Sequence, residues 1–110
     1  MKIDWSNKKV LILGFSLSGK AVTNYLSDTD CSVYITEQRE EGANDKEDIE
    51  NLSSFGVKIE FGGHSNEFTS GVNVAIVSPS FPLDNELYIK LKSEGVDIIS
   101  EPDLAYLESD

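Results

Sequence analysis

Cysteine and histidine are nearly absent from this chain, with Cys31 and His64 as the only examples. A single thiol excludes an intrachain disulfide or a cysteine metal cluster. We expect Cys31 to act as a small apolar residue at the start of a strand. His64 lies in the turn Gly62-Gly63-His64-Ser65, where we expect it at the surface. The sequence therefore predicts no metal site.

Basic residues are also scarce. Nine Lys and Arg stand against 20 Asp and Glu, the net charge is −11, and Arg39 is the only arginine. Such a chain repels a long polyanion, which argues against nucleic acid as a partner. A small phosphorylated ligand remains compatible, because backbone N–H groups at the start of a helix supply local positive potential.

Long hydrophobic runs are missing as well. No apolar stretch approaches the roughly 18 residues of a membrane span. The first apolar run follows a charged start and is too short for a signal peptide. With 110 residues, of which 39% are hydrophobic, the composition predicts one compact cytoplasmic domain.

The most informative segment that is present is an apolar strand running into a loop from Gly14 to Gly19 and then a helix. The dinucleotide fingerprint GxGxxG fits except for Ser16 at its middle glycine. Gly14 permits a sharp turn and Gly19 permits close packing of helix on strand, while Ser16 and Ser18 offer hydroxyls beside the helix start. A turn used only for packing is the structural alternative.

The same loop nearly matches the P-loop pattern, in which GxxxxGK is followed by Ser or Thr. Here Ala21 replaces the hydroxyl residue that would coordinate Mg²⁺. Neither later strand, ending at Val77-Ser78 or Ile99-Ser100, supplies a Walker B aspartate. ATP hydrolysis by this loop is therefore disfavoured.

Short apolar runs alternate with helical patterns along the chain, which predicts a parallel sheet with right-handed crossovers. The expected fold is α/β, a Rossmann-like five-stranded parallel sheet with helices on both faces. In such sheets ligands bind at the carboxyl ends of the strands. We expect strands at 9–14, 32–36, 57–61, 73–77 and 96–99, and helices at 19–27, 45–54, 85–94 and 101–108.

Two further loops follow strands at that edge. Glu37, Gln38 and Arg39 close the second strand, where an acid can meet a ribose hydroxyl or a base edge and a guanidinium can meet a phosphate or a base carbonyl. Ser78, Pro79 and Ser80 follow the Val-Ala-Ile-Val strand, and the prolines at 79 and 82 fix the path of that loop. The structural alternative for the first loop is that its polar residues only solvate the end of a strand. For the second loop it is that the prolines only make a stiff connector.

Taken in order, these segments resemble the N-terminal domain of the Mur ligases over essentially the whole chain. The resemblance rests on Lys9-Val-Leu-Ile-Leu-Gly14, the glycine loop, the acidic strand end, Ser78-Pro79-Ser80-Phe81, and the closing run from Ile99 to Leu107. It is nearest to the branch that joins D-glutamate to UDP-N-acetylmuramoyl-L-alanine in peptidoglycan synthesis. Glu37-Gln38 and Ser80 depart from the family pattern, which usually has Asp-Thr and Gly there.

The resemblance implies that residues 1–110 form a single domain that holds the UDP part of this substrate. Its expected contacts are Leu17, Ser18 and Gly19 for the diphosphate and uracil side, Glu37, Gln38 and Arg39 for the uracil edge, and Ser78 and Ser80 for the rest of the uridine; Gly14, Ser16 and Pro79 would shape the loops. ATP, Mg²⁺ and the catalytic residues belong to further domains of the family's ligases, which we expect to be missing from residues 1–110. We therefore expect no catalytic residue, no cofactor and no ligation by this chain alone.

Two other interpretations stay open. A Rossmann module that senses NAD or another adenine nucleotide is compatible with Glu37 and the glycine loop, although Ser16 and the proline loop count against it. A binding scaffold without a small ligand is compatible with the acidic surface.

Overall fold

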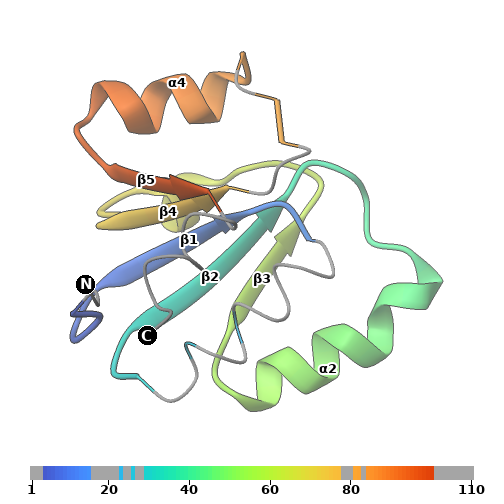
Figure 1. Ribbon diagram of the computed structural model, residues 1–110. Coiled ribbons are helices and arrows are strands. Elements are labelled where there is room, and N and C mark those ends of the chain that lie inside the picture. Colours follow the sequence, from blue (N-terminus) through green and yellow to red (C-terminus); the bar gives the residue numbers. More distant parts are fainter. Residues whose placement is uncertain are drawn as a thin grey trace.

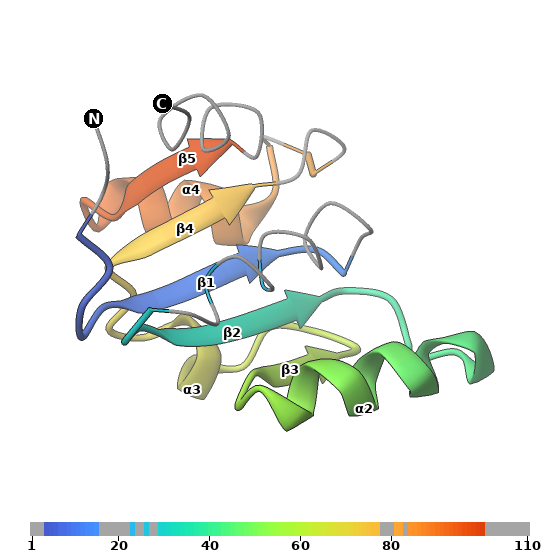
Figure 2. The same cartoon turned by 60° about the horizontal axis from the view of Figure 1, so that its bottom comes forward.

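A computed structural model describes residues 4–15, 23, 26, 29–77, 81, 82 and 84–100. Five strands form one parallel sheet in the order β3-β2-β1-β4-β5 (Figures 1 and 2). They are β1 (Lys9–Leu13), β2 (Ser32–Glu37), β3 (Lys58–Phe61), β4 (Val74–Val77) and β5 (Asp97–Ser100). The expected strands are confirmed, with ends that differ by no more than one residue.

The helices lie on both sides of this sheet, as expected. They are α2 (Lys46–Ser54), preceded by the 3-10 turn η1 (Ala43–Asp45), α3 (Asn66–Thr69) and α4 (Glu86–Ser93). Figure 1 shows α2 and α4 on opposite faces of the sheet. Of the helix expected at 19–27, the described residues Thr23 and Leu26 are helical and buried. The helix expected at 101–108 lies outside the described residues.

Successive side chains along each strand point to opposite faces of the sheet, and this produces two separate hydrophobic cores. On one face Val10 and Ile12 of β1 pack with Leu52 of α2, and on the other Leu11 and Leu13 pack with Leu91 of α4. All four side chains of β1 named here are 0% exposed. A strand apolar at successive positions is what a sheet covered on both faces requires, so the run Val-Leu-Ile-Leu explains why β1 is central.

Polar side chains cap the starts of α3 and α4. The Asn85 Oδ1 atom accepts from the Leu87 N–H at 2.9 Å and caps α4. Ser65 caps α3 in the same way through the Phe68 N–H. The one-turn helix α3, between β3 and β4, was not expected from the sequence because four residues are too few to show a helical period.

The turn after β3 is bonded to the end of β2. The Gly62 N–H donates to the Arg39 carbonyl at 2.9 Å, and the Gly63 N–H donates to the Glu37 carbonyl at 3.3 Å. Glu37, Gln38 and Arg39 are three of the expected contacts. Their backbone is thus held by hydrogen bonds from the turn at 62–65.

His64 closes this turn, and the expectation that it lies at the surface is wrong. It is half-buried, and its Nδ1 lies 2.7 Å from the Oγ1 of Thr36, a fully buried residue of β2. Thr36 Oγ1 also donates to the Gly63 carbonyl or to a Glu60 carboxylate oxygen, at 3.2 and 3.3 Å. Both of those atoms only accept, so a Thr36 hydroxyl hydrogen that points at either of them leaves Oγ1 to accept from His64 Nδ1–H, whereas in the other tautomer of His64 the hydroxyl donates to Nδ1.

Among the described residues, the buried His64 Nε2 atom has no hydrogen-bond partner. The protonated ring carries an N–H at both nitrogens, so its Nε2–H would meet no acceptor among those residues. Burial accordingly lowers the pKa of His64 below its usual 6.5, and the negative charges of Glu60 and Glu37 offset only part of that effect. The structure therefore favours neutral His64.

We predict that truncating the middle of β1 destabilises the whole domain. Leu11 is 0% exposed and pairs with Tyr34 of β2 and Ala75 of β4, so Leu11→Ala removes packing from the central strand. The expected loss in the free energy of unfolding is about 2–5 kcal/mol, measured by urea denaturation. Ile89→Ala on α4, where the side chain is 55% exposed, is the control and should change stability by no more than about 0.5 kcal/mol. Equal effects of the two variants would contradict this account of the core.

We also predict that His64 contributes a pH dependence of stability. Because its folded pKa lies below the unfolded value of about 6.5, the unfolded chain takes up the proton first. The stabilisation by neutral His64 is complete above that pH and is lost as the pH falls from 6.5 through the folded pKa. His64→Asn can keep an N–H near the Nδ1 position but does not titrate, so this part of the dependence should disappear. Urea unfolding of both proteins between pH 5 and 8 tests this; equal slopes would exclude the role of His64.

Candidate functional site

The expected site residues divide between described and undescribed parts of the chain. Gly14, Glu37, Gln38 and Arg39 are described. The other expected residues lie outside the described ranges, namely Ser16, Leu17, Ser18, Gly19, Ser78, Pro79 and Ser80. The structure therefore bears directly on the start of the first loop and on the whole of the second.

The ends of β1, β2 and β4 meet at one edge of the sheet. Leu13 pairs with Thr36 on one side and with Val77 on the other, so the three loops begin from neighbouring strand ends. The strand order reverses at β1, between β2 and β4. This is the position at which open parallel sheets bind ligands.

Gly14 makes the turn out of β1. Its φ is +104°, and its N–H donates to the Thr36 carbonyl at 2.9 Å, extending the pairing of β1 with β2 by one bond. Among the described residues, no atom would lie within 4 Å of a Cβ atom at Gly14. The positive φ is the reason that glycine suits this position.

Glu37 joins the two described loops. One carboxylate oxygen, Oε1, accepts from the Phe15 N–H at 2.9 Å, and the other, Oε2, accepts from the Arg39 N–H at 3.0 Å. Two backbone donors therefore fix the orientation of this carboxylate at the strand end. Each oxygen retains a further lone pair for a ligand donor.

Arg39 is held by a neighbour that sequence reasoning missed. Its Nη1 and Nη2 atoms donate to the two carboxylate oxygens of Asp45 at 2.8 and 3.1 Å. The guanidinium carbon lies 5.8 Å from the ring centroid of Phe15 and 5.2 Å from that of Phe61. The hydrogen bonds to Asp45 raise the pKa of Arg39, so the guanidinium stays cationic.

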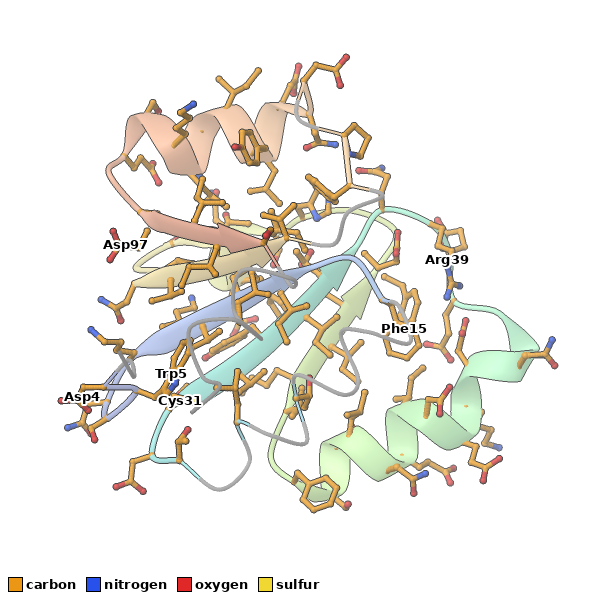
Figure 3. All side chains as sticks on the ribbon, viewed as in Figure 1. Asp4, Trp5, Phe15, Cys31, Arg39 and Asp97 are labelled. Carbon is orange, nitrogen blue, oxygen red and sulfur yellow. The ribbon has the colours of Figure 1, made fainter. Side chains whose placement is uncertain are left out.

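The two rings form a pair of their own, with centroids 5.1 Å apart and planes inclined by 56°. Phe15 follows β1 and Phe61 ends β3, so the two rings come from different segments and meet near the end of β2. Figure 3 shows Phe15 and Arg39 close together beyond the strand ends, at the far side from Asp97. Phe61 could have been suspected from the sequence, because it ends a strand at the ligand-binding edge; Asp45 carried no such signal.

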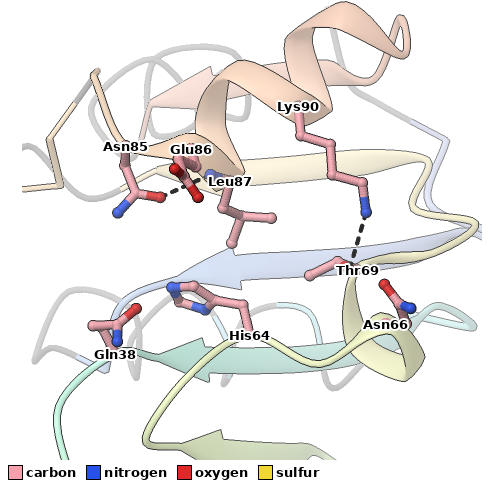
Figure 4. A pocket seen from close by; sticks show the side chains of 8 residues that line it. All are labelled: Gln38, His64, Asn66, Thr69, Asn85, Glu86, Leu87 and Lys90. Carbon is pink, nitrogen blue, oxygen red and sulfur yellow. Dashed lines mark hydrogen bonds between the residues drawn. The ribbon is translucent and has the colours of Figure 1, made fainter.

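Gln38 lies on a different surface from Glu37 and Arg39. It contributes to a pocket of about 390 Å³ between α3 and α4, together with His64, Thr69, Asn85 and Lys90 (Figure 4). The Lys90 Nζ atom reaches across it toward Thr69 Oγ1 at 3.5 Å. Of the expected residues that the structure describes, Gln38 alone lines this pocket.

The described residues show neither a metal site nor a membrane helix. Within those ranges no three side chains among His, Cys, Asp and Glu gather as metal ligands would. No described helix has the length and apolarity that a membrane crossing requires.

A known structure with a similar fold is SirC, a precorrin-2 dehydrogenase. It matches with a TM-score of 0.59 at 9% sequence identity, covering 89% of this chain and 46% of that one. At so low an identity the similarity concerns the fold alone, a Rossmann-type sheet.

Curated relatives are far closer in sequence. UDP-N-acetylmuramoylalanine--D-glutamate ligases are 31% identical over 104 residues in Caldanaerobacter subterraneus subsp. tengcongensis and 33% identical over 103 residues in Pelotomaculum thermopropionicum, each covering 94% of this chain. The ligase of Streptococcus uberis is 32% identical over 107 residues. The chain spans about a quarter of the length of these relatives, 22–23%.

The family model of the Mur ligase MurD-like N-terminal domain matches residues 8–100. That range begins just before β1 and ends with β5, so it includes the whole described sheet. The chain therefore belongs to the family of MurD-like N-terminal domains of Mur ligases.

Proposed function

We propose that residues 1–110 bind the uridine diphosphate part of UDP-N-acetylmuramoyl-L-alanine, as the substrate-holding domain of a D-glutamate ligase. The substrate is taken from the name shared by the relatives. The observation that supports it most is the Glu37 carboxylate, aimed by the Phe15 and Arg39 N–H groups at the edge where Rossmann-type sheets bind nucleotides.

The chemistry of Glu37 favours uracil over other bases. Uracil presents an imide N3–H, which a carboxylate accepts, flanked by two carbonyl oxygens, which a guanidinium such as Arg39 can meet. Cytosine presents an unprotonated N3, whose lone pair would face the negative carboxylate. Uridine nucleotides should therefore bind better than cytidine nucleotides of equal charge.

The diphosphate contacts are assigned to Leu17, Ser18 and Gly19, and further uridine contacts to Ser78 and Ser80. The loops that carry these residues begin next to each other, which supports the assignment. Gly14 follows Leu13 of β1, and Leu13 pairs with Val77 at the end of β4. Backbone N–H groups at a helix start offset the acidic net charge locally, as a phosphate requires.

In the complete ligase this domain would act as a handle on the substrate. The nucleotide is remote from the alanyl carboxylate of the substrate, which is the group that reacts. Contacts to the nucleotide raise the effective concentration of this carboxylate at a catalytic centre in another domain. ATP and Mg²⁺ would be used there, and residues 1–110 alone should not catalyse ligation. A few charge-assisted hydrogen bonds, less the cost of association, suggest roughly millimolar to high-micromolar affinity for this domain by itself.

An amide-resolved NMR titration of the 110-residue chain with UDP-N-acetylmuramoyl-L-alanine, UDP, CDP, NAD and Mg-ATP tests the proposal. Uridine ligands should shift residues 15–19, 37–39 and 78–81, and CDP should do so less. Larger NAD-induced shifts in the same segments would instead support a module that senses adenine nucleotides. A chain that responds to none of the five ligands would support a scaffold.

We predict that Glu37→Gln reduces the preference for uridine. Loss of one charge-assisted hydrogen bond, about 1.5–3 kcal/mol, corresponds to roughly 10- to 150-fold weaker UDP binding, with CDP affected far less. Glu41→Gln removes the same charge from an exposed position four residues on and is the matched control. If the two variants change UDP binding equally, Glu37 has no specific effect and does not recognise the base.

A further inference from the structure

Four side chains from four separate segments make one cluster at the edge of the proposed uracil site. Phe15 follows β1, Arg39 follows β2, Asp45 ends η1 and Phe61 ends β3. We call these four residues the guanidinium clamp. Its centre is Arg39, which contacts the other three through two ring faces and one bidentate ion pair.

The side chain of Asp45 is more buried than that of the arginine that it holds. It is 14% exposed, against 46% for Arg39. Its Oδ2 also accepts from the Gly42 N–H at 2.7 Å, which fixes the carboxylate at the start of η1. The position of Arg39 is therefore set by a carboxylate that the backbone has already placed.

The bidentate pair uses only part of the guanidinium. Nη1 donates to Asp45 and to the Glu40 carbonyl, and Nη2 donates one hydrogen to Asp45. Among the described residues no acceptor meets Nε–H or the second hydrogen of Nη2. These two donors lie on one edge of a planar group and suit a carbonyl oxygen.

A free arginine side chain loses considerable conformational entropy when a ligand orders it. In this domain Asp45 and the two rings order Arg39 before any ligand arrives. The segment Glu37–Arg39 then carries both a held carboxylate and a held guanidinium, the two groups that an imide N–H next to a carbonyl would need.

We propose that Asp45 is a positioning residue for base recognition, holding Arg39 on the Phe15–Phe61 pair so that its unused donor edge meets a carbonyl of the pyrimidine. This inference rests on the proposed function. It adds a role for a residue that does not touch the base and acts only through Arg39.

A double-mutant cycle on UDP binding tests the role of Asp45. The four proteins are the wild type, Asp45→Asn, Arg39→Ala and the double variant, each titrated with UDP by NMR and unfolded thermally. The asparagine side chain in Asp45→Asn would retain an acceptor for the Gly42 N–H, so the melting temperature should change little. We expect Asp45→Asn to weaken UDP binding about threefold to tenfold in the wild-type background and less than about twofold when Arg39 is already Ala.

The control is Asp97→Asn, which removes the same charge from an exposed position at the start of β5, at the opposite end of the molecule (Figure 3). It should leave UDP affinity unchanged. Equal losses from Asp45→Asn with and without Arg39, or no loss in either background, would overturn the positioning role while leaving UDP binding by the wild type intact. A wild-type chain that shows no UDP-induced shifts would overturn the proposed function and this inference with it.

A second readout separates positioning from folding. In the ligand-free wild type, the Arg39 Nε–H resonance should report a restricted side chain, and in Asp45→Asn it should show averaged motion while the amide spectrum elsewhere is retained. A restricted Arg39 in Asp45→Asn would show that the rings alone hold the guanidinium, and Asp45 would lose its assigned role.

Discussion

Burial of β1 on both faces is the constraint on which the rest of this structure depends. Val10 and Ile12 enter one core and Leu11 and Leu13 the other, and each of the four is 0% exposed. Such a strand can only be central, with β2 and β4 as its neighbours. The point at which the strand order reverses therefore lies at the end of β1, and the candidate site lies there for the same reason.

Around that strand end, hydrogen bonds link segments that are far apart in the chain. The Gly14 N–H reaches the Thr36 carbonyl, and the Phe15 N–H reaches the Glu37 carboxylate. The turn after β3 in turn supports the backbone of Glu37 and Arg39. The second loop is thus fixed from both sides, which explains how a short polar segment at a surface can hold a defined shape without a ligand.

The polar residues near this strand end fall into two groups that the sequence alone does not distinguish. Thr36 Oγ1 and His64 Nδ1 are bonded to each other inside the domain, and the burial of His64 Nε2 works against a charged ring. Glu37 and Arg39 use some of their hydrogen-bonding groups to hold their own positions and keep others available. Residues of the second group are the ones that we propose bind a nucleotide; Phe15 contacts both of them, and Asp45 and Phe61 contact Arg39.

The sequence by itself determined the fold class, the five strands to within one residue, and the edge at which a site could form. It could do so because strand periodicity, the glycine at position 14 and the order of apolar runs are local properties. Tertiary structure decided what each polar residue at that edge does. It left His64, which the sequence suggested was a surface residue, half-buried against Thr36. It also placed Gln38 in a pocket and brought Asp45 and Phe61 to Arg39. Those relationships depend on the packing of segments far apart in the chain, such as Phe15 and Phe61, which are 46 residues apart, and no pattern within any one segment encodes them.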